Sequence, residues 1–192
     1  MLGGKGLQKA NLSVGETIFK KARPYIHDSL SREWNIFLIG KDLKGKNSMR
    51  NKIYSSLTNS PGKDIAISFP ENLFEEQLLQ RTLNLLSLEN LLAKSVDAIV
   101  LCAESPGSLA ELGAFSNHGL LNNKLIVYLD QKYSRDKSFI NLGPVKYLKQ
   151  KTNSKVNYIP FNMPFSRNDS IKLRNNIRTL KKTKSLLITI VF

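Results

Sequence analysis

Glu111 lies in the stretch CAESPGSLAELGAF, from Cys102 to Phe115, whose residue types suit the binding and attack of a phosphorylated sugar. Ser105 and Pro106 fit the N-cap and the first position of a helix, where the missing N–H of proline costs nothing. The backbone N–H groups of Gly107 and Ser108 would then lie at a helix N-terminus, which is a ready site for an anion.

Two interpretations of Glu111 follow from its position in the second turn of this helix. A carboxylate there stays ionised near the positive end of the helix dipole, and it could trap or stabilise the oxocarbenium-like state of a sugar. Alternatively, Ser108 to Glu111 satisfies the capping-box pattern, with Ser108 as the N-cap. The earlier Ser105-Pro106 start favours the first interpretation.

The sequence also leaves two other functions open. Gly40 to Asn47 (GKDLKGKN) nearly spells a phosphate-binding P-loop, which would make the protein an ATPase, but Asn47 stands where that pattern needs Ser or Thr. A non-catalytic nucleic-acid-binding module is the other alternative, because Tyr133, Tyr147 and Tyr158 lie among basic residues as stacking surfaces. No recognised nucleic-acid-binding signature supports it.

The charge distribution separates an acidic centre from basic flanks. The 192 residues carry a formal net charge of +14, yet residues 61–120 hold 8 acids and only 3 Lys or Arg. Basic flanks indicate attraction to nucleic acid or phosphorylated substrates. One Cys and two distant His exclude a metal cluster built from these residues, so we expect neither a metal nor another cofactor. Without a signal peptide or an apolar span we expect a cytoplasmic protein that binds no membrane.

Apolar runs of strand length alternate with helix-length amphipathic stretches along the chain. Such strands indicate a parallel sheet covered on both faces, so the predicted fold class is α/β, Rossmann-like (flavodoxin-like), with about five strands. Ligands of such sheets bind beyond the carboxyl ends of the strands. The predicted strands are 34–40, 64–69, 96–103, 124–130 and 156–161, and the predicted helices are 48–57, 71–94, 106–118 and 167–184.

Three regions are expected from these patterns. Residues 1–33 form a basic N-terminal segment, 34–165 an α/β domain, and 166–192 a basic C-terminal helix and tail. The final SLLITIVF is read either as a terminal strand or as the remnant of a longer protein.

The block VDAIVLCAESPGSLAELGAFSNHGLLNNKLIVYLD resembles the core of the nucleoside 2-deoxyribosyltransferase-like family. Together with ISFPENLFEEQL and SLENLLAKSVDAIV, it is similar to retron-encoded effectors built on that fold. Those effectors act as toxins in bacterial antiphage systems, beside a reverse transcriptase and its branched RNA–DNA product.

This resemblance implies an N-glycosidase toxin that cleaves the base–sugar bond of nucleotides, deoxynucleotides or NAD. It implies Glu111 as the catalytic carboxylate. It also implies partnership with the retron reverse transcriptase and its RNA–DNA product, and it leaves a homo-oligomer open. The implied substrate-binding residues are Gly40, Lys41, Asp42, Arg50, Glu71, Ser105, Gly107 and Ser108.

Overall fold

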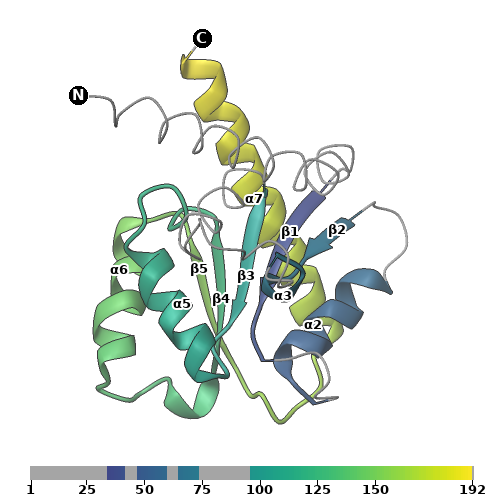
Figure 1. Cartoon of the computed structure of the whole chain (residues 1–192), viewed down its shortest axis with the longest axis vertical. Helices are drawn as coiled ribbons and strands as arrows, with labels where there is room; N and C mark the ends of the chain where they lie inside the picture. The colour runs from purple at the N-terminus through teal and green to yellow at the C-terminus, as the bar shows by residue number, and fades with distance from the viewer. Residues whose placement is uncertain (1–33, 42–46, 60–64, 74–95, 192) are drawn as a thin grey trace, which may run out of the picture.

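Five parallel strands form a single sheet in the order β2-β1-β3-β4-β5 (Figure 1). This computed structural model describes residues 34–41, 47–59, 65–73 and 96–191. The strands are β1 (Trp34–Ile39), β2 (Ile65–Ser68), β3 (Ala98–Cys102), β4 (Leu125–Asp130) and β5 (Lys155–Ile159). The helices are α2 (Met49–Thr58), α3 (Pro70–Leu73), α5 (Pro106–Ser116), η1 (Gln131–Tyr133), η2 (Asn141–Val145), α6 (Lys146–Lys151) and α7 (Arg167–Val191).

The central strands are apolar along nearly their whole length because helices cover both faces of the sheet. Every residue of β1 and β3 is buried, and so are five of the six residues of β4. β5 lies at an edge and is only partly buried, and it stops just before Pro160, whose missing N–H prevents further pairing.

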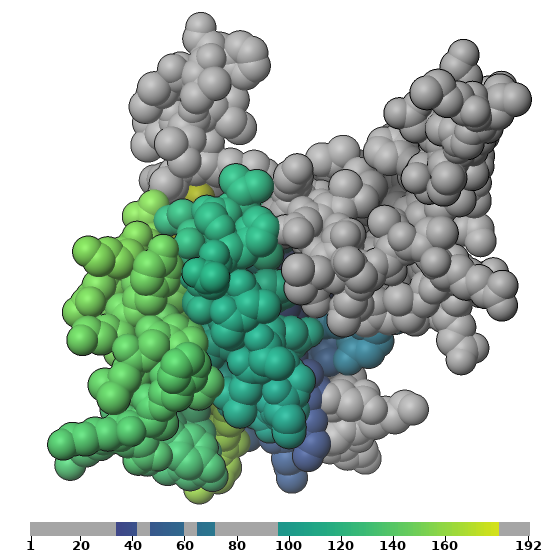
Figure 2. Space-filling model, turned by 60° about the vertical axis from the view of Figure 1, so that its left-hand side comes forward, coloured from purple at the N-terminus to yellow at the C-terminus, as the bar shows by residue number. Residues whose placement is uncertain are grey.

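Two apolar clusters hold the layers together. On one face α2 and α7 pack against the sheet, with Ile53 from α2 and Leu173 from α7 in the same cluster as Ile36 of β1. On the other face α5, η2 and α6 pack against residues such as Phe37 and Leu101. Figure 2 looks toward this second face, where teal α5 lies beside green α6.

The strand order places a topological switch point between β1 and β3. These two strands pair with each other although β2 separates them in the sequence. The chain leaves β1 for α2 on one face and leaves β3 for α5 on the other. Connections that diverge in this way open a crevice at the carboxyl edge, where ligands of flavodoxin-like sheets bind.

The predicted fold class is confirmed, and the five predicted strands appear within two residues of their expected bounds. The terminal-strand reading of the last residues is wrong, because α7 continues as a helix to Val191. This helix buries Leu173, Ile177 and Leu180 against the sheet. Of the predicted helix 71–94 only its start, in α3, lies among the described residues, and the segment 1–33 lies outside them.

The connection between β4 and β5 contains elements that the sequence did not predict. η1, η2 and α6 occupy residues 131–133 and 141–151, and η2 is a π-helix that contains Pro144. No helix in the described ranges is both long enough and apolar enough to cross a membrane.

Candidate functional site

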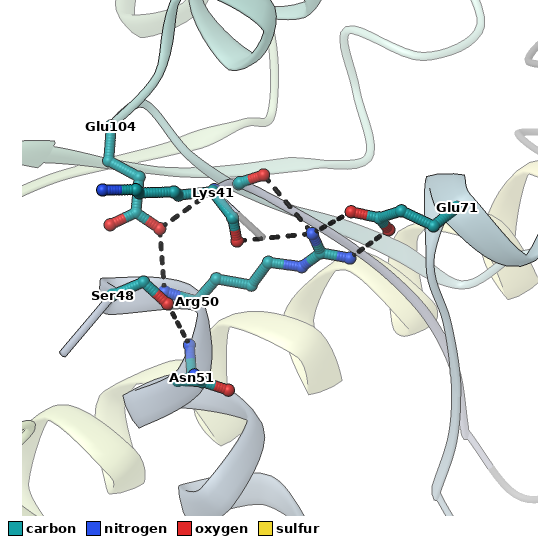
Figure 3. Close-up of polar contacts among 7 residues, drawn as sticks. Lys41, Ser48, Arg50, Asn51, Glu71 and Glu104 are labelled. Atoms are coloured by element: carbon teal, nitrogen blue, oxygen red, sulfur yellow. Dashed lines mark hydrogen bonds and ion pairs between the residues drawn. The ribbon is translucent and has the colours of Figure 1, made fainter. Parts of the chain in front are cut away.

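The carboxylate of Glu104, just beyond β3, ties the loop after β1 to the start of α2. Its Oε2 accepts a hydrogen bond from the Met49 N–H at 2.8 Å, and its Oε1 accepts one from the Arg50 N–H at 3.1 Å. Oε1 also accepts the Lys41 N–H at 3.2 Å. Glu104 therefore acts as a long-range N-terminal cap of α2, which complements the positive end of the helix dipole (Figure 3).

Gly40 is required at this edge because three groups close in on its α-carbon. A Cβ added there would lie 3.0 Å from the Cβ of Arg50, 3.0 Å from the Cβ of Cys102 and 3.0 Å from Oε1 of Glu104. Real Cβ atoms rarely approach other atoms so closely, so any larger residue would push the two loops apart. The predicted first substrate loop thus begins with a glycine that permits close packing.

Arg50 points from α2 toward the end of β2, although its side chain is fully buried. Its two terminal nitrogens donate to the Glu71 carboxylate at 2.6 and 2.5 Å, which is bidentate pairing. Nη1 also approaches the carbonyl oxygens of Gly40 at 3.3 Å and Lys41 at 3.4 Å. Arg50 therefore positions the loop after β1 and the start of α3 relative to each other.

The guanidinium of Arg50 also lies over an aromatic ring, with its central carbon 4.9 Å from the ring centroid of Phe69. A planar cation held between a carboxylate and an aromatic face has little freedom to rotate. Arg50 is therefore rigid at this edge, and lysine could reproduce neither the bidentate pair nor the stacking.

The start of α5 is closed by reciprocal contacts between two serines. Ser105 is the N-cap and its Oγ accepts the Ser108 N–H at 3.2 Å, while Oγ of Ser108 accepts the Ser105 N–H at 3.0 Å. Pro106 holds the first helical position, as the sequence predicts. The Ser108 hydroxyl also accepts the Glu104 N–H at 3.1 Å, so this turn is joined directly to Glu104.

These contacts decide between the two capping patterns near Glu111. Ser105 caps the helix and Ser108 is its third residue, so the alternative in which Ser108 caps and Glu111 completes the capping box is wrong. Glu111 lies one turn further on and is partly buried. Helical side chains lean toward the N-terminus, so the Glu111 carboxylate is expected over the turn that holds Gly107 and Ser108.

Burial around Cys102 makes the floor of the site chemically inert. Burial raises the pKa of the Cys102 thiol well above its ordinary value, and the neighbouring Glu104 raises it further. The protonated thiol is a poor nucleophile. Asp97, at the opposite end of β3, accepts the Asn35 N–H at 3.1 Å and is structural, as its position at a strand start indicates.

The structure brings six of the predicted site residues into one connected group. Hydrogen bonds run from Lys41 through Glu104 to Arg50 and Glu71, and from Glu104 to the turn that carries Ser105 and Ser108. Gly40 packs in the middle of this group. Gly107 lies between the two serines and Glu111 lies one turn further along α5, whereas Asp42 lies outside the described residues. Their contacts with a substrate stay predictions.

Glu104 is the residue whose role sequence reasoning missed. Its partners lie 54 to 63 residues away, so no local pattern reveals the contacts. The available signal was an acidic residue directly after a buried strand, at the switch point of the predicted sheet.

The arrangement at the start of α2 argues against a P-loop. A P-loop leaves the N–H groups at the start of its helix free for phosphate. Here the Glu104 carboxylate takes the N–H groups of Met49 and Arg50. Within the described part of the chain, no group of three or more His, Cys, Asp or Glu side chains is arranged to hold a metal ion.

Comparison with known proteins relates the chain to retron proteins. A family model described as the STM3845 retron effector protein matches residues 46–189. A candidate ribosyltransferase/DNA-binding protein of retron Ec86 from Escherichia coli is 48% identical over 121 residues, which are 62% of this chain and 38% of the relative. A protein of the same description from retron Ec73 of Escherichia coli is 39% identical over 80 residues, 42% of this chain and 25% of the relative. The matched parts thus span well under half the length of these relatives.

Proposed function

Because the chain belongs to the STM3845 retron effector family, we propose that it is an enzyme that breaks the base–sugar bond of a nucleotide, deoxynucleotide or NAD-type molecule. The names of both Escherichia coli relatives include ribosyltransferase, which is chemistry at the same anomeric carbon. We propose that this activity serves as the toxin of a retron antiphage system.

One observation carries the proposal: Glu111 lies one turn inside a helix whose capped N-terminus is at the β1/β3 switch point. That place in the fold is where flavodoxin-like sheets bind nucleotides. A carboxylate that follows a helix N-terminus stays ionised, as attack on an electron-poor carbon requires.

In the proposed reaction, a Glu111 carboxylate oxygen forms a bond to the anomeric carbon while the bond from that carbon to the base nitrogen breaks. The electron pair of the broken bond leaves with the base. Nicotinamide departs from an NAD-type substrate as a neutral molecule, whereas the base of a nucleotide departs as an anion that takes a proton from solvent. Water releases the sugar from the carboxylate, or another base accepts it. Stabilisation of the sugar cation without a covalent bond is the variant in which water attacks directly.

Residues at the same edge have separate tasks in this scheme. The N–H of Gly107, at the second position of α5, is directed toward the end of the helix and suits a substrate phosphate. The exposed Lys41, whose backbone N–H donates to Glu104 at the same edge, adds positive charge. Glu104, Arg50 and Glu71 act as positioning residues, because they contact the backbone and one another.

The proposed partners are a retron reverse transcriptase and its RNA–DNA product. Family membership supports this partnership, and the net charge of +14 favours association with a polyanion.

The test is to incubate the chain with a mixture of nucleotides, deoxynucleotides and NAD, and to measure released free base by chromatography. The assay is run with and without the RNA–DNA product. Glu111→Gln keeps the shape of the side chain and should reduce base release at least a hundredfold, since it removes the nucleophile. Lys172→Ala, which removes an exposed charged side chain from α7, on the face of the sheet opposite α5, is the control and should keep full activity.

A further inference from the structure

The connection between β4 and β5 exposes large apolar side chains that the proposed chemistry does not use. Phe139 is 82% exposed, Leu142 60%, Tyr133 49% and Tyr147 44%. All four come from η1, η2, α6 and the short segment between them. We call these four residues the 133–147 patch. Figure 2 shows the green surface of this region on the side of the molecule that α5 and α6 cover.

The patch is held rigidly although its side chains face solvent. Asn141 donates from Nδ2 to the carbonyl oxygens of Tyr133 at 2.7 Å and Asp136 at 2.8 Å. Its Oδ1 accepts the hydroxyl hydrogen of Tyr158 at 2.7 Å, which joins the segment to β5. These bonds fix the backbone that carries the exposed aromatics, so binding of a ligand needs little further ordering of this segment.

The Phe139 ring packs against the backbone at Gly143. A Cβ added to Gly143 would lie 3.6 to 3.8 Å from the Phe139 ring, so the ring rests on the backbone of η2 at this point. One face of the ring is thereby supported while most of its surface stays in water. π-helical turns are frequently found at functional sites, and η2 is a π-helix.

Positive charge surrounds these side chains. Residues 131–151 contain six Lys or Arg and a single acid, Asp136. Lys132 lies over the Tyr133 ring, with its Nζ 4.7 Å from the centroid, and Lys149 lies 4.9 Å from the centroid of Tyr158. A second copy of this chain would bring the same positive surface, so self-association through the patch is electrostatically unfavourable.

We propose that the 133–147 patch binds single-stranded nucleic acid, with bases stacked on Phe139 and the tyrosines and phosphates contacted by the surrounding lysines. Alternating aromatic faces and cations are the means by which proteins bind single strands without reading their sequence. An acidic protein would use the cations but would leave the exposed ring faces without planar partners. The proposal gives a surface to the nucleic-acid partner proposed above, and it does not depend on the base-release chemistry.

The patch begins at the sheet edge that carries the candidate site. η1 directly follows the carboxyl end of β4, and η2 packs against α5, the helix of Glu111. A single-stranded nucleic acid bound to the patch would therefore lie near the mouth of the site.

The experiment measures the fluorescence anisotropy of labelled oligonucleotides in the Glu111→Gln background, in which the strand is not consumed. Poly-deoxythymidine, poly-uridine and duplex DNA form three arms, measured between about 50 and 200 mM salt. Phe139→Ala should weaken single-strand binding about fivefold or more, and Phe139→Trp should retain it. If Lys146 and Lys149 each contact a phosphate, their joint replacement by Ala should lower the slope of log affinity against log salt by about 1.4.

Two matched controls lie away from the patch. Leu120→Ala removes another exposed apolar side chain before β4, and Lys172→Ala removes an exposed lysine from α7, on the opposite face of the sheet. Both should bind as the parent does. Three results would overturn the proposal. The first is an equal loss of affinity for Phe139→Ala and Leu120→Ala, and the second is tighter binding of duplex DNA than of single strands. The third is the absence of any oligonucleotide binding at low salt. Base release is measured separately on the parent chain. A failure of the nucleic-acid-binding proposal can thereby be distinguished from a failure of the glycosidase proposal.

Discussion

Replacing Glu71 by glutamine tests how the buried guanidinium of Arg50 is held. Arg50 has no exposed surface, and two of its nitrogens donate to the Glu71 carboxylate. Glutamine keeps the size of the side chain but has no charge and one acceptor oxygen in place of two. Arg50 then stays buried with its charge uncompensated.

The expected loss follows from the exposure of the two partners. Breaking a fully buried ion pair from one side costs about 3 to 5 kcal/mol. Glu71 is 55% exposed, so water screens the pair, and Arg50 retains the carbonyls of Gly40 and Lys41. We therefore expect the free energy of unfolding to fall by about 2 kcal/mol, which lowers the melting temperature by about 4 to 8 °C for a chain of this length.

The assay is urea unfolding of Glu71→Gln beside the wild-type chain, with thermal melting as a second measure. Lys132→Ala is the control, since the 63% exposed Lys132 side chain pairs with Asp130, which is 17% exposed, at 3.4 Å. The Lys132 ammonium lies in water and Asp130 keeps the hydrogen bond from the Lys132 N–H, so the control should unfold nearly as the wild type does. A Glu71→Gln protein as stable as the Lys132→Ala control would refute the claim that Glu71 compensates a buried charge.

Three other substitutions test contacts of the site and the core. Glu104→Gln should lower the free energy of unfolding by about 1 to 2 kcal/mol in urea titrations, because one amide oxygen cannot accept three backbone N–H groups; no loss would show that the cap of α2 is unimportant. Ser105→Ala should lower the free energy of unfolding by about 1 kcal/mol. The double variant Ser105→Ala/Ser108→Ala should lose less free energy of unfolding than the two single variants together, because the two serines hydrogen-bond to each other. Tyr128→Phe should stabilise the protein, because the buried Tyr128 hydroxyl has no hydrogen-bond partner among the described residues. Burial raises the pKa of Tyr128 in the folded state. Above the ordinary tyrosine pKa of about 10 the unfolded chain therefore loses this proton first, and the free energy of unfolding falls as pH rises. The decline of stability in alkaline urea titrations should therefore be shallower in Tyr128→Phe, and an unchanged decline would contradict this assignment.

Local patterns predicted the parts of the structure that depend on neighbouring residues. Buried strands such as WNIFLI and AIVLC are continuous apolar runs, which indicated a parallel sheet between helices. The start of α5 was predictable because Pro106 suits the first helical position and so identifies Ser105 as the cap.

Contacts between distant residues were not predictable from the same patterns. Glu104 caps a helix that begins 55 residues earlier, and Arg50 pairs with Glu71 across two connections. Gly143 and Pro144 indicate a loop on local grounds, yet packing of Pro144 and Val145 keeps them in a π-helix. The β-branched residues of the final octapeptide favour a strand. However, α7 is already anchored on the sheet through Leu173 and Ile177, and the helix continues from there to Val191.

The most direct test of the central claim is base release by the wild-type chain and by Glu111→Gln, measured side by side on the same mixture of nucleotides and NAD. We expect the wild type to release free base from at least one substrate, in the absence or the presence of the RNA–DNA product. We expect Glu111→Gln to lose at least 99% of that rate while it unfolds at the same urea concentration. No free base under either condition would contradict the glycosidase claim, and equal release by the two proteins would contradict the role of Glu111.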